Sequence, residues 1–171
     1  MRFHVLLSIA VLLVSSARLC RDHPPNVPRS CPITKPSDRP FVPPAPYAEG
    51  HTTRDQFWYG SDRLWTKLPA SGAWVVLPHY TPDDPTFRQK LFFWVQGFDA
   101  HAPQQSQLVL KGRRLDAAAP ALLTDGPGTP SWTSDEQFLV TGINFPTAGC
   151  WEITATYAVK ELSFVVWVGS K

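Results

Sequence analysis

The sequence is poor in charge and in methionine. Charged residues make up 18% of the chain, and 16 basic against 14 acidic side chains give a formal net charge of +2. A nucleic-acid-binding protein would show a concentrated basic face, so this balance argues against a nucleic-acid partner. The single methionine, Met1, would leave with a cleaved leader, and no histidine follows Cys150. Both facts argue against a blue-copper site, which takes two histidines, a cysteine and usually an axial methionine.

Motifs of several enzyme classes are also missing. No Gly-x-Ser-x-Gly nucleophile elbow occurs, which removes the main signature of one class of hydrolases. The zinc motif His-Glu-x-x-His and the redox motif Cys-x-x-Cys are absent, and so is a phosphate-binding glycine loop. We therefore expect no cofactor and no enzymatic activity of these types.

The N-terminus has the layout of a secretory signal peptide. A short basic start at residues 1–4 precedes an apolar run over Val5–Val14 and small residues that end at Ala17. The run is about half as long as a transmembrane helix, which needs roughly 20 residues. We predict a signal peptide at residues 1–17 and an exported chain, periplasmic, cell-surface or extracellular, with no transmembrane segment. An uncleaved anchor and a lipid on Cys20 are the alternatives, although the residues before Cys20 fit lipoprotein processing poorly.

Residues 18–50 form a proline-rich segment that holds nine of the 18 prolines. Proline favours extended conformations and cannot donate to a regular hydrogen-bond ladder. We interpret the segment as a spacer, or as an extended strap laid over the domain. The competing interpretation is a ligand for a proline-binding module, but such modules are mainly intracellular.

Residues 51–171 contain short apolar runs separated by turn residues. This pattern, with no long helical periodicity, predicts an all-β domain, a sandwich or a barrel. In the last two runs, residues 151–157 and 162–168, apolar and polar side chains alternate, which predicts a β-hairpin with one buried face. The expected strands are Gln56–Gly60, Leu64–Leu68, Ala73–Leu77, Lys90–Phe98, Gln107–Leu115, Gln137–Asn144, Trp151–Tyr157 and Leu162–Val168.

The segment from Phe145 to Tyr157, together with Leu162–Val168, resembles the closing hairpin of bacterial extracytoplasmic immunoglobulin-like domains. More narrowly, the chain resembles a family of secreted bacterial proteins without an assigned function. That family combines Cys31-Pro-Ile-Thr34, Gly112-Arg-Arg-Leu-Asp116 and a Gly-Cys-Trp-Glu segment. The resemblance covers residues 31–168 and implies an immunoglobulin-like β-sandwich in an exported protein. It implies no mechanism, because none of these motifs carries known chemistry.

Three cysteines in an exported chain cannot all pair within one molecule. Cys31 and Cys150 both lie in the part that the resemblance covers, so we expect these two to form a disulfide and Cys20 to be left over. A pair between Cys20 and Cys31 is the alternative, and the sequence alone does not fix the connectivity. Free thiols are disfavoured in an oxidising compartment.

Three sets of polar residues are candidate sites: three histidines, two pairs of loop carboxylates and a basic cluster. The histidines His51, His79 and His101 lie near predicted loops, but scattered histidines are more often solvent-exposed than metal ligands, so we expect no metal site. A basic cluster, Lys111 with Arg113 and Arg114, could hold an anion, but alternation puts Lys111 and Arg113 on the solvent face of a strand.

The remaining candidates are paired loop carboxylates, Asp83 with Asp84 and Asp135 with Glu136. Such residues are mostly solvated turn formers. They nevertheless carry our alternative function, a small glycan-active hydrolase that uses loop carboxylates.

Aromatic side chains are the best functional lead. Residues 91–95 are apolar on both faces of a strand, so Phe92 and Trp94 would point away from the core. Trp58 and Tyr59 add two more rings. Outward rings are either covered by the strap and loops or form a platform that binds a ligand such as a sugar. We therefore expect an exported, non-catalytic binding or structural module, with a glycan or an envelope protein as its partner.

Overall fold

The computed structural model describes residues 27–47, 52–75, 86–103 and 107–169. The predicted signal peptide at residues 1–17 and Cys20 lie outside these residues. The described residues form ten β-strands and no α-helix, and thus no helix long and apolar enough to cross a membrane. The strands are β1 (Gln56–Gly60), β2 (Leu64–Pro69), β3 (Ala73–Val75), β4 (Phe87–Val95), β5 (Leu108–Arg114), β6 (Leu123–Thr124), β7 (Thr129–Trp132), β8 (Gln137–Phe145), β9 (Gly149–Tyr157) and β10 (Lys160–Gly169).

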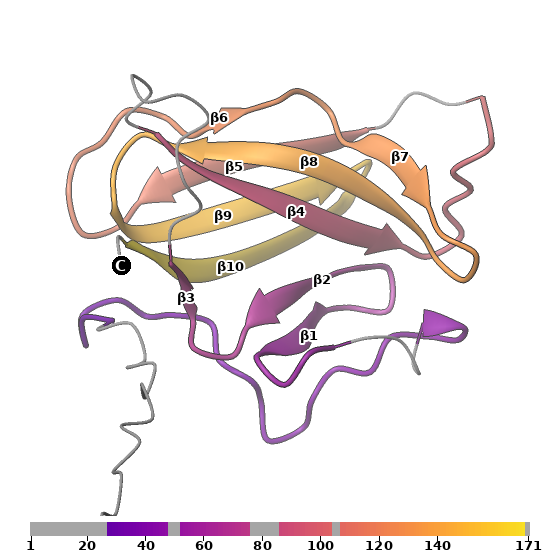
Figure 1. The fold of residues 1–171 in the computed structure, drawn as a ribbon, viewed down its shortest axis with the longest axis horizontal. Coiled ribbons are helices and arrows are strands. Elements are labelled where there is room, and N and C mark those ends of the chain that lie inside the picture. The colour runs from indigo at the N-terminus through magenta and orange to yellow at the C-terminus, as the bar shows by residue number, and fades with distance from the viewer. Residues whose placement is uncertain (1–26, 48–51, 76–85, 104–106, 170–171) are drawn as a thin grey trace, which may run out of the picture.

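The strands are arranged in two sheets (Figure 1). The larger sheet has six strands in the order β1-β2-β4-β8-β6, with β7 also paired to β8. The smaller sheet has four strands in the order β3-β10-β9-β5. All strand pairs are antiparallel except β3 with β10, which is parallel. The predicted all-β class is therefore confirmed, in a form with two sheets.

One hydrophobic core lies between the sheets and takes side chains from both. Trp151 and Ile153 on β9 are fully buried, as is Phe93 on β4, and Phe164 on β10 is nearly so. Burying a large apolar side chain stabilises a fold by about 1.5–3 kcal/mol. Strands β9 and β10 pair over nearly their whole length, so the hairpin with one buried face predicted from alternation is confirmed.

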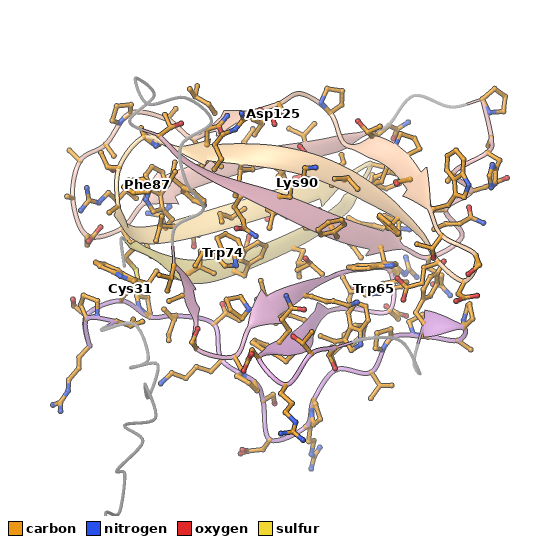
Figure 2. All side chains as sticks on the ribbon, in the orientation of Figure 1. Cys31, Trp65, Trp74, Phe87, Lys90 and Asp125 are labelled. Carbon is orange, nitrogen blue, oxygen red and sulfur yellow. A yellow bond between two sulfur atoms is a disulfide. The ribbon has the colours of Figure 1, made fainter. Side chains whose placement is uncertain are left out.

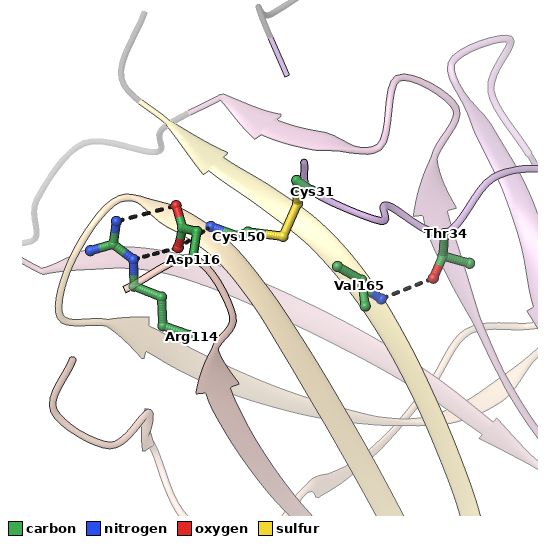
Figure 3. The surroundings of a disulfide bond; sticks show 6 residues. All are labelled: Cys31, Thr34, Arg114, Asp116, Cys150 and Val165. Carbon is green, nitrogen blue, oxygen red and sulfur yellow. Dashed lines mark hydrogen bonds and ion pairs between the residues drawn. A yellow bond between two sulfur atoms is a disulfide. The ribbon is translucent and has the colours of Figure 1, made fainter. Parts of the chain in front are cut away.

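The described part of the proline-rich segment, residues 27–47, runs along the domain, and we call it the strap. A disulfide joins Cys31 in the strap to Cys150 on β9, with the two Cα atoms 5.6 Å apart (Figure 3). Three residues on, the Thr34 amide donates to the Val165 carbonyl at 2.9 Å, and the Val165 amide donates to the Thr34 hydroxyl at 2.9 Å. The expected disulfide is therefore confirmed, and the two hydrogen bonds of Thr34, one through its amide and one through its hydroxyl, attach the strap to β10 as well.

The other end of the strap contacts the larger sheet. Phe41 and Tyr47 pack on Trp65 of β2 with ring centroids 6.3 and 5.5 Å away, and Trp65 is fully buried. Burial raises the pKa of the Tyr47 hydroxyl. The strap is thus attached to the smaller sheet by its beginning and to the larger sheet by its end.

The described strands differ from the expected ones mainly at β4, and two short strands, β6 and β7, were not expected. Strand β4 begins and ends three residues earlier than predicted. It ends at Val95 because Gly97 has a φ of 71° and the Phe98 amide donates to the Val95 carbonyl in a turn, and its first residues, from Phe87, pair with β8. Strand β7 was not predicted, because Pro130 interrupts its pattern. A proline is tolerated there since β7 pairs on one side only, with β8.

Candidate functional site

The outer face of the larger sheet carries a row of aromatic side chains. On β4, Leu91, Phe93 and Val95 are buried in the core. Successive side chains of a strand point to opposite faces, so Phe92 and Trp94 lie on the outer face, as the sequence predicts. Their surroundings then decide whether they are covered or open.

Trp94 is covered, whereas Phe92 is open. Trp94 is 3% exposed, because Trp58 from β1 packs on it edge-on at 4.9 Å and Phe138 from β8 lies 5.8 Å away. Phe92 meets the same Phe138 at 5.7 Å but remains 40% exposed. Phe92 is therefore the ring of this cluster that a ligand can reach, and Trp94 supports the rings around it.

Lys67 on β2 lies between two indole rings. Its Nζ atom is 4.4 Å from the ring centroid of Trp58 and 4.8 Å from that of Trp94, and both contacts are attractive cation–π interactions. Burial lowers the pKa of the Lys67 ammonium, and the nearby charge of Glu136 acts in the opposite direction. The two indole rings and the carboxylate of Glu136 thus attract the Lys67 ammonium and hold this side chain against the rings.

A groove of about 540 Å³ opens beside these rings, and we call it the β2–β4 groove. Strands β2 and β4 pair only from Leu64 opposite Val95 to Thr66 opposite Phe93. Beyond this point β4 continues along β8, and the opening is also lined by Trp74 of β3 (labelled in Figure 2), whose ring packs against Phe145 and Phe164. The groove is lined by Gln56, Lys67, Trp74, Gln89, Lys90, Leu91, Phe92, Trp94, Thr133, Asp135, Glu136 and Phe138.

Polar groups occur along the walls of the β2–β4 groove. Gln56 and Gln89 supply side-chain amides, of which Gln89 Nε2 also donates to the Lys90 carbonyl at 3.0 Å. Thr133 supplies a hydroxyl that accepts the Glu136 amide at 3.1 Å. Glu136 has one buried carboxylate oxygen without a hydrogen-bond partner among the described residues. Aromatic surface combined with a few polar groups is typical of a small-molecule site.

A second groove of about 470 Å³ adjoins the first, and we call it the β7–β8 groove. It shares Lys90, Phe92 and Phe138 with the first groove, so these three side chains form a ridge between the two. Its other lining residues are Asp125, Pro127, Thr129, Pro130, Ser131, Val140, Thr141 and Gly142. The two grooves thus adjoin at these three side chains.

Tyr59, the remaining aromatic candidate, lies on the opposite face of β1 from Trp58. Its hydroxyl donates to the Ser163 carbonyl at 2.9 Å, and its ring packs edge-on against Phe164 at 6.4 Å. Burial raises the pKa of the Tyr59 hydroxyl. Tyr59 therefore contacts the smaller sheet and does not line either groove.

Two of the four carboxylate candidates belong to the described residues, and the other two do not. Asp135 and Glu136 line one end of the β2–β4 groove. Asp83 and Asp84 lie outside the described residues. No other Asp or Glu of the described residues lines the β2–β4 groove.

The histidine candidates do not form a cluster in the described part of the chain. His101 packs against the indole of Trp132 at 4.6 Å, and His51 and His79 lie outside the described residues. Over residues 27–47, 52–75, 86–103 and 107–169, no group of three or more His, Cys, Asp or Glu side chains could hold a metal ion.

The basic candidates on β5 have structural partners. Arg113 pairs with Glu152 at 2.6 Å, and Lys111 is exposed beside them. Arg114 donates to Asp116 at 2.7 Å, and Asp116 also accepts the Cys150 amide at 3.1 Å (Figure 3). These hydrogen bonds lower the pKa of the Asp116 carboxyl, with that from Arg114 the largest cause. Arg114 and Asp116 thus stabilise the loop next to the disulfide.

Sequence reasoning missed several groove residues, although part of the signal was present. Alternation in β8 places Phe138 on the outer face because Leu139 is buried. The same alternation places Lys67 outward beside the buried Leu68. Gln56, Gln89 and Trp74 had no local signal, because the opening between β2 and β4 brings them together.

Comparison of the chain with family models, with curated proteins and with solved structures gave no match. The geometry of the two grooves therefore carries the functional inference by itself.

Proposed function

We propose that this protein is an exported, non-catalytic binding module with an immunoglobulin-like β-sandwich, and that its β2–β4 groove binds an oligosaccharide. The predicted signal peptide at residues 1–17 and the disulfide between Cys31 and Cys150 support export, because disulfides persist in oxidising compartments. The observation that carries the binding proposal is the exposed ring of Phe92 at the edge of a groove with amide, hydroxyl and charged side chains.

The chemistry of the groove fits a sugar. The apolar C–H face of a pyranose packs on an aromatic ring, and Phe92 offers such a ring within a supporting cluster of Trp94 and Phe138. Sugar hydroxyls need donors and acceptors around the rim, and Gln56 and Gln89 supply both. An exposed apolar patch is costly unless it is used, which also favours a ligand at Phe92.

The alternative, a small glycan hydrolase, has one observation in its favour: Asp135 and Glu136 line the groove. Glycoside hydrolysis normally needs two carboxylates that flank the scissile bond. Asp135 and Glu136 are neighbours in the chain at one end of the groove, and its β4 wall carries Gln89 and Lys90 instead. We therefore favour binding without hydrolysis.

The test is titration of the protein with a panel of oligosaccharides of several linkages, followed by tryptophan fluorescence and calorimetry. We expect binding by some members of the panel and about tenfold weaker binding by Phe92→Ala. Phe92 is preferable to Trp94 for this test, because truncating the buried Trp94 would leave a cavity. Val109→Ala, an exposed apolar residue of the smaller sheet, is the matched control and should bind like the wild type.

Two results would count against the proposal. Absence of binding across the whole panel would refute the glycan ligand. Release of shortened oligosaccharides, abolished by Glu136→Gln, would replace binding by the hydrolase alternative.

A further inference from the structure

The charges around the two grooves are unequally compensated. Asp125 pairs with Arg88 at 3.1 Å and accepts a hydrogen bond from the Asn144 amide at 3.2 Å. Lys67 lies between two indoles and near Glu136. Lys90, in contrast, is exposed and makes no ion pair with any described residue.

Lys90 also has a central position. It lines both grooves, as do Phe92 and Phe138. Lys90 and Phe92 are two residues apart on β4, so their side chains leave the same face of the sheet about 6.6 Å apart along the strand. That spacing suits a sugar ring on Phe92 with a substituent of the ring directed at the ammonium of Lys90.

Resting on the proposed function, we infer that the ligand is an acidic oligosaccharide. A uronic acid unit packs its ring on Phe92, and its carboxylate accepts a charge-assisted hydrogen bond from Lys90. Because Lys90 and Phe92 form the ridge between the two grooves, the neighbouring units of the ligand extend into the β2–β4 groove on one side and the β7–β8 groove on the other. The site thus recognises an internal stretch of a chain rather than a single terminal sugar.

The experiment compares oligouronides of three to six units, in several linkages, with their carboxyl-reduced counterparts. Each pair has the same linkage and length and differs only in the acid groups. Calorimetry is done with the protein purified with its disulfide intact. The variants are Lys90→Met, Lys90→Arg and Lys111→Met, the last being an exposed lysine of the smaller sheet with the same change in net charge. Thermal unfolding of each variant checks that it is folded.

We expect an oligouronide to bind at least about tenfold more tightly than its reduced counterpart, and this preference to weaken at high salt. Lys90→Met should remove the preference, and Lys90→Arg should keep it because the charge remains. Lys111→Met should bind like the wild type. Affinity should also rise with chain length, since longer chains reach both grooves.

The outcomes separate this inference from the proposed function. Equal affinity for acidic and reduced chains, or a preference unchanged in Lys90→Met, would overturn the acidic ligand and leave the glycan-binding proposal standing. Binding of neither form would overturn both. If Lys111→Met weakens the binding of the acidic chains as much as Lys90→Met does, the effect is one of net charge. That result would overturn the role of Lys90.

Discussion

Removing the disulfide between Cys31 and Cys150 should destabilise the protein strongly. The bridge joins residues separated by 119 positions, so it closes a loop that takes in most of the domain. The relation between loop length and the entropy of the unfolded chain gives a loss of about 5 kcal/mol when such a bridge is removed. Many domains have a total free energy of unfolding of only about 5–15 kcal/mol, so the expected loss is a large fraction of it.

The measurement is urea unfolding followed by tryptophan fluorescence, with the free energy of unfolding obtained by linear extrapolation. Cys20 is replaced by alanine in every protein compared, so that no other thiol is present. The double variant Cys31→Ala, Cys150→Ala is compared with the oxidised parent. The parent reduced in place keeps both sulfur atoms, and it therefore separates the loss of the bridge from the loss of buried side-chain volume.

We expect the free energy of unfolding to fall by about 3–5 kcal/mol in both the reduced parent and the double variant. The dependence on urea should steepen in both, because an unbridged chain exposes more surface when it unfolds. A loss below about 1 kcal/mol in the reduced parent would refute the chain-entropy reasoning. A loss confined to the double variant would assign the effect to packing around the sulfur atoms.

Two further predictions concern the strap and the loop beside the disulfide. Gly72 and Gly97 both have a φ of 71°, but a Cβ on Gly72 would lie 2.9 Å from the Cβ of Ile33 in the strap, whereas a Cβ on Gly97 would meet nothing within 4 Å. Gly97→Ala should therefore cost about 1 kcal/mol of backbone strain and Gly72→Ala clearly more, as measured by urea unfolding; equal costs would refute the contact with Ile33. Asp116 has a pKa below its ordinary 3.8, chiefly because Arg114 donates to it, so its contribution to stability is present above that value and is lost as the pH falls through the folded pKa. Unfolding experiments between about pH 5 and about pH 2 should show this loss, and Asp116→Asn should flatten that part of the profile.

The elements that follow from local alternation could be predicted from the sequence. The hairpin β9–β10 has a strict period of two, and Trp151 and Phe164 enter the core as that period requires. The same rule gave the directions of Phe92 and Trp94 on β4. Strand β7 could not be predicted, because Pro130 is acceptable only on a strand that pairs on one side, and the sequence does not reveal which strands lie at an edge.

The exposure of the aromatic residues could not be predicted, because it depends on strand pairing. Trp94 on β4 is covered by Trp58 from β1 and Phe138 from β8, two strands that lie on opposite sides of β4 in the sheet. Phe92 is only two residues away and remains open. The β2–β4 groove depends in the same way on where two strands part, since their pairing ends at Thr66. Such features are set by tertiary contacts and leave no local pattern.

The attachment of the strap has a consequence for the order in which the fold is assembled. The strap is made early in synthesis, but Cys150 and Val165, to which it attaches, lie 119 and 131 residues further along the chain than Cys31 and Thr34. Strand β3 likewise has its pairing partner in β10, the last strand. The beginning of the strap and strand β3 therefore lack these partners until the hairpin β9–β10 exists, whereas the end of the strap can already pack on Trp65 of β2. Contacts so distant in sequence form slowly, so the beginning of the strap and β3 attach only after this hairpin has been made.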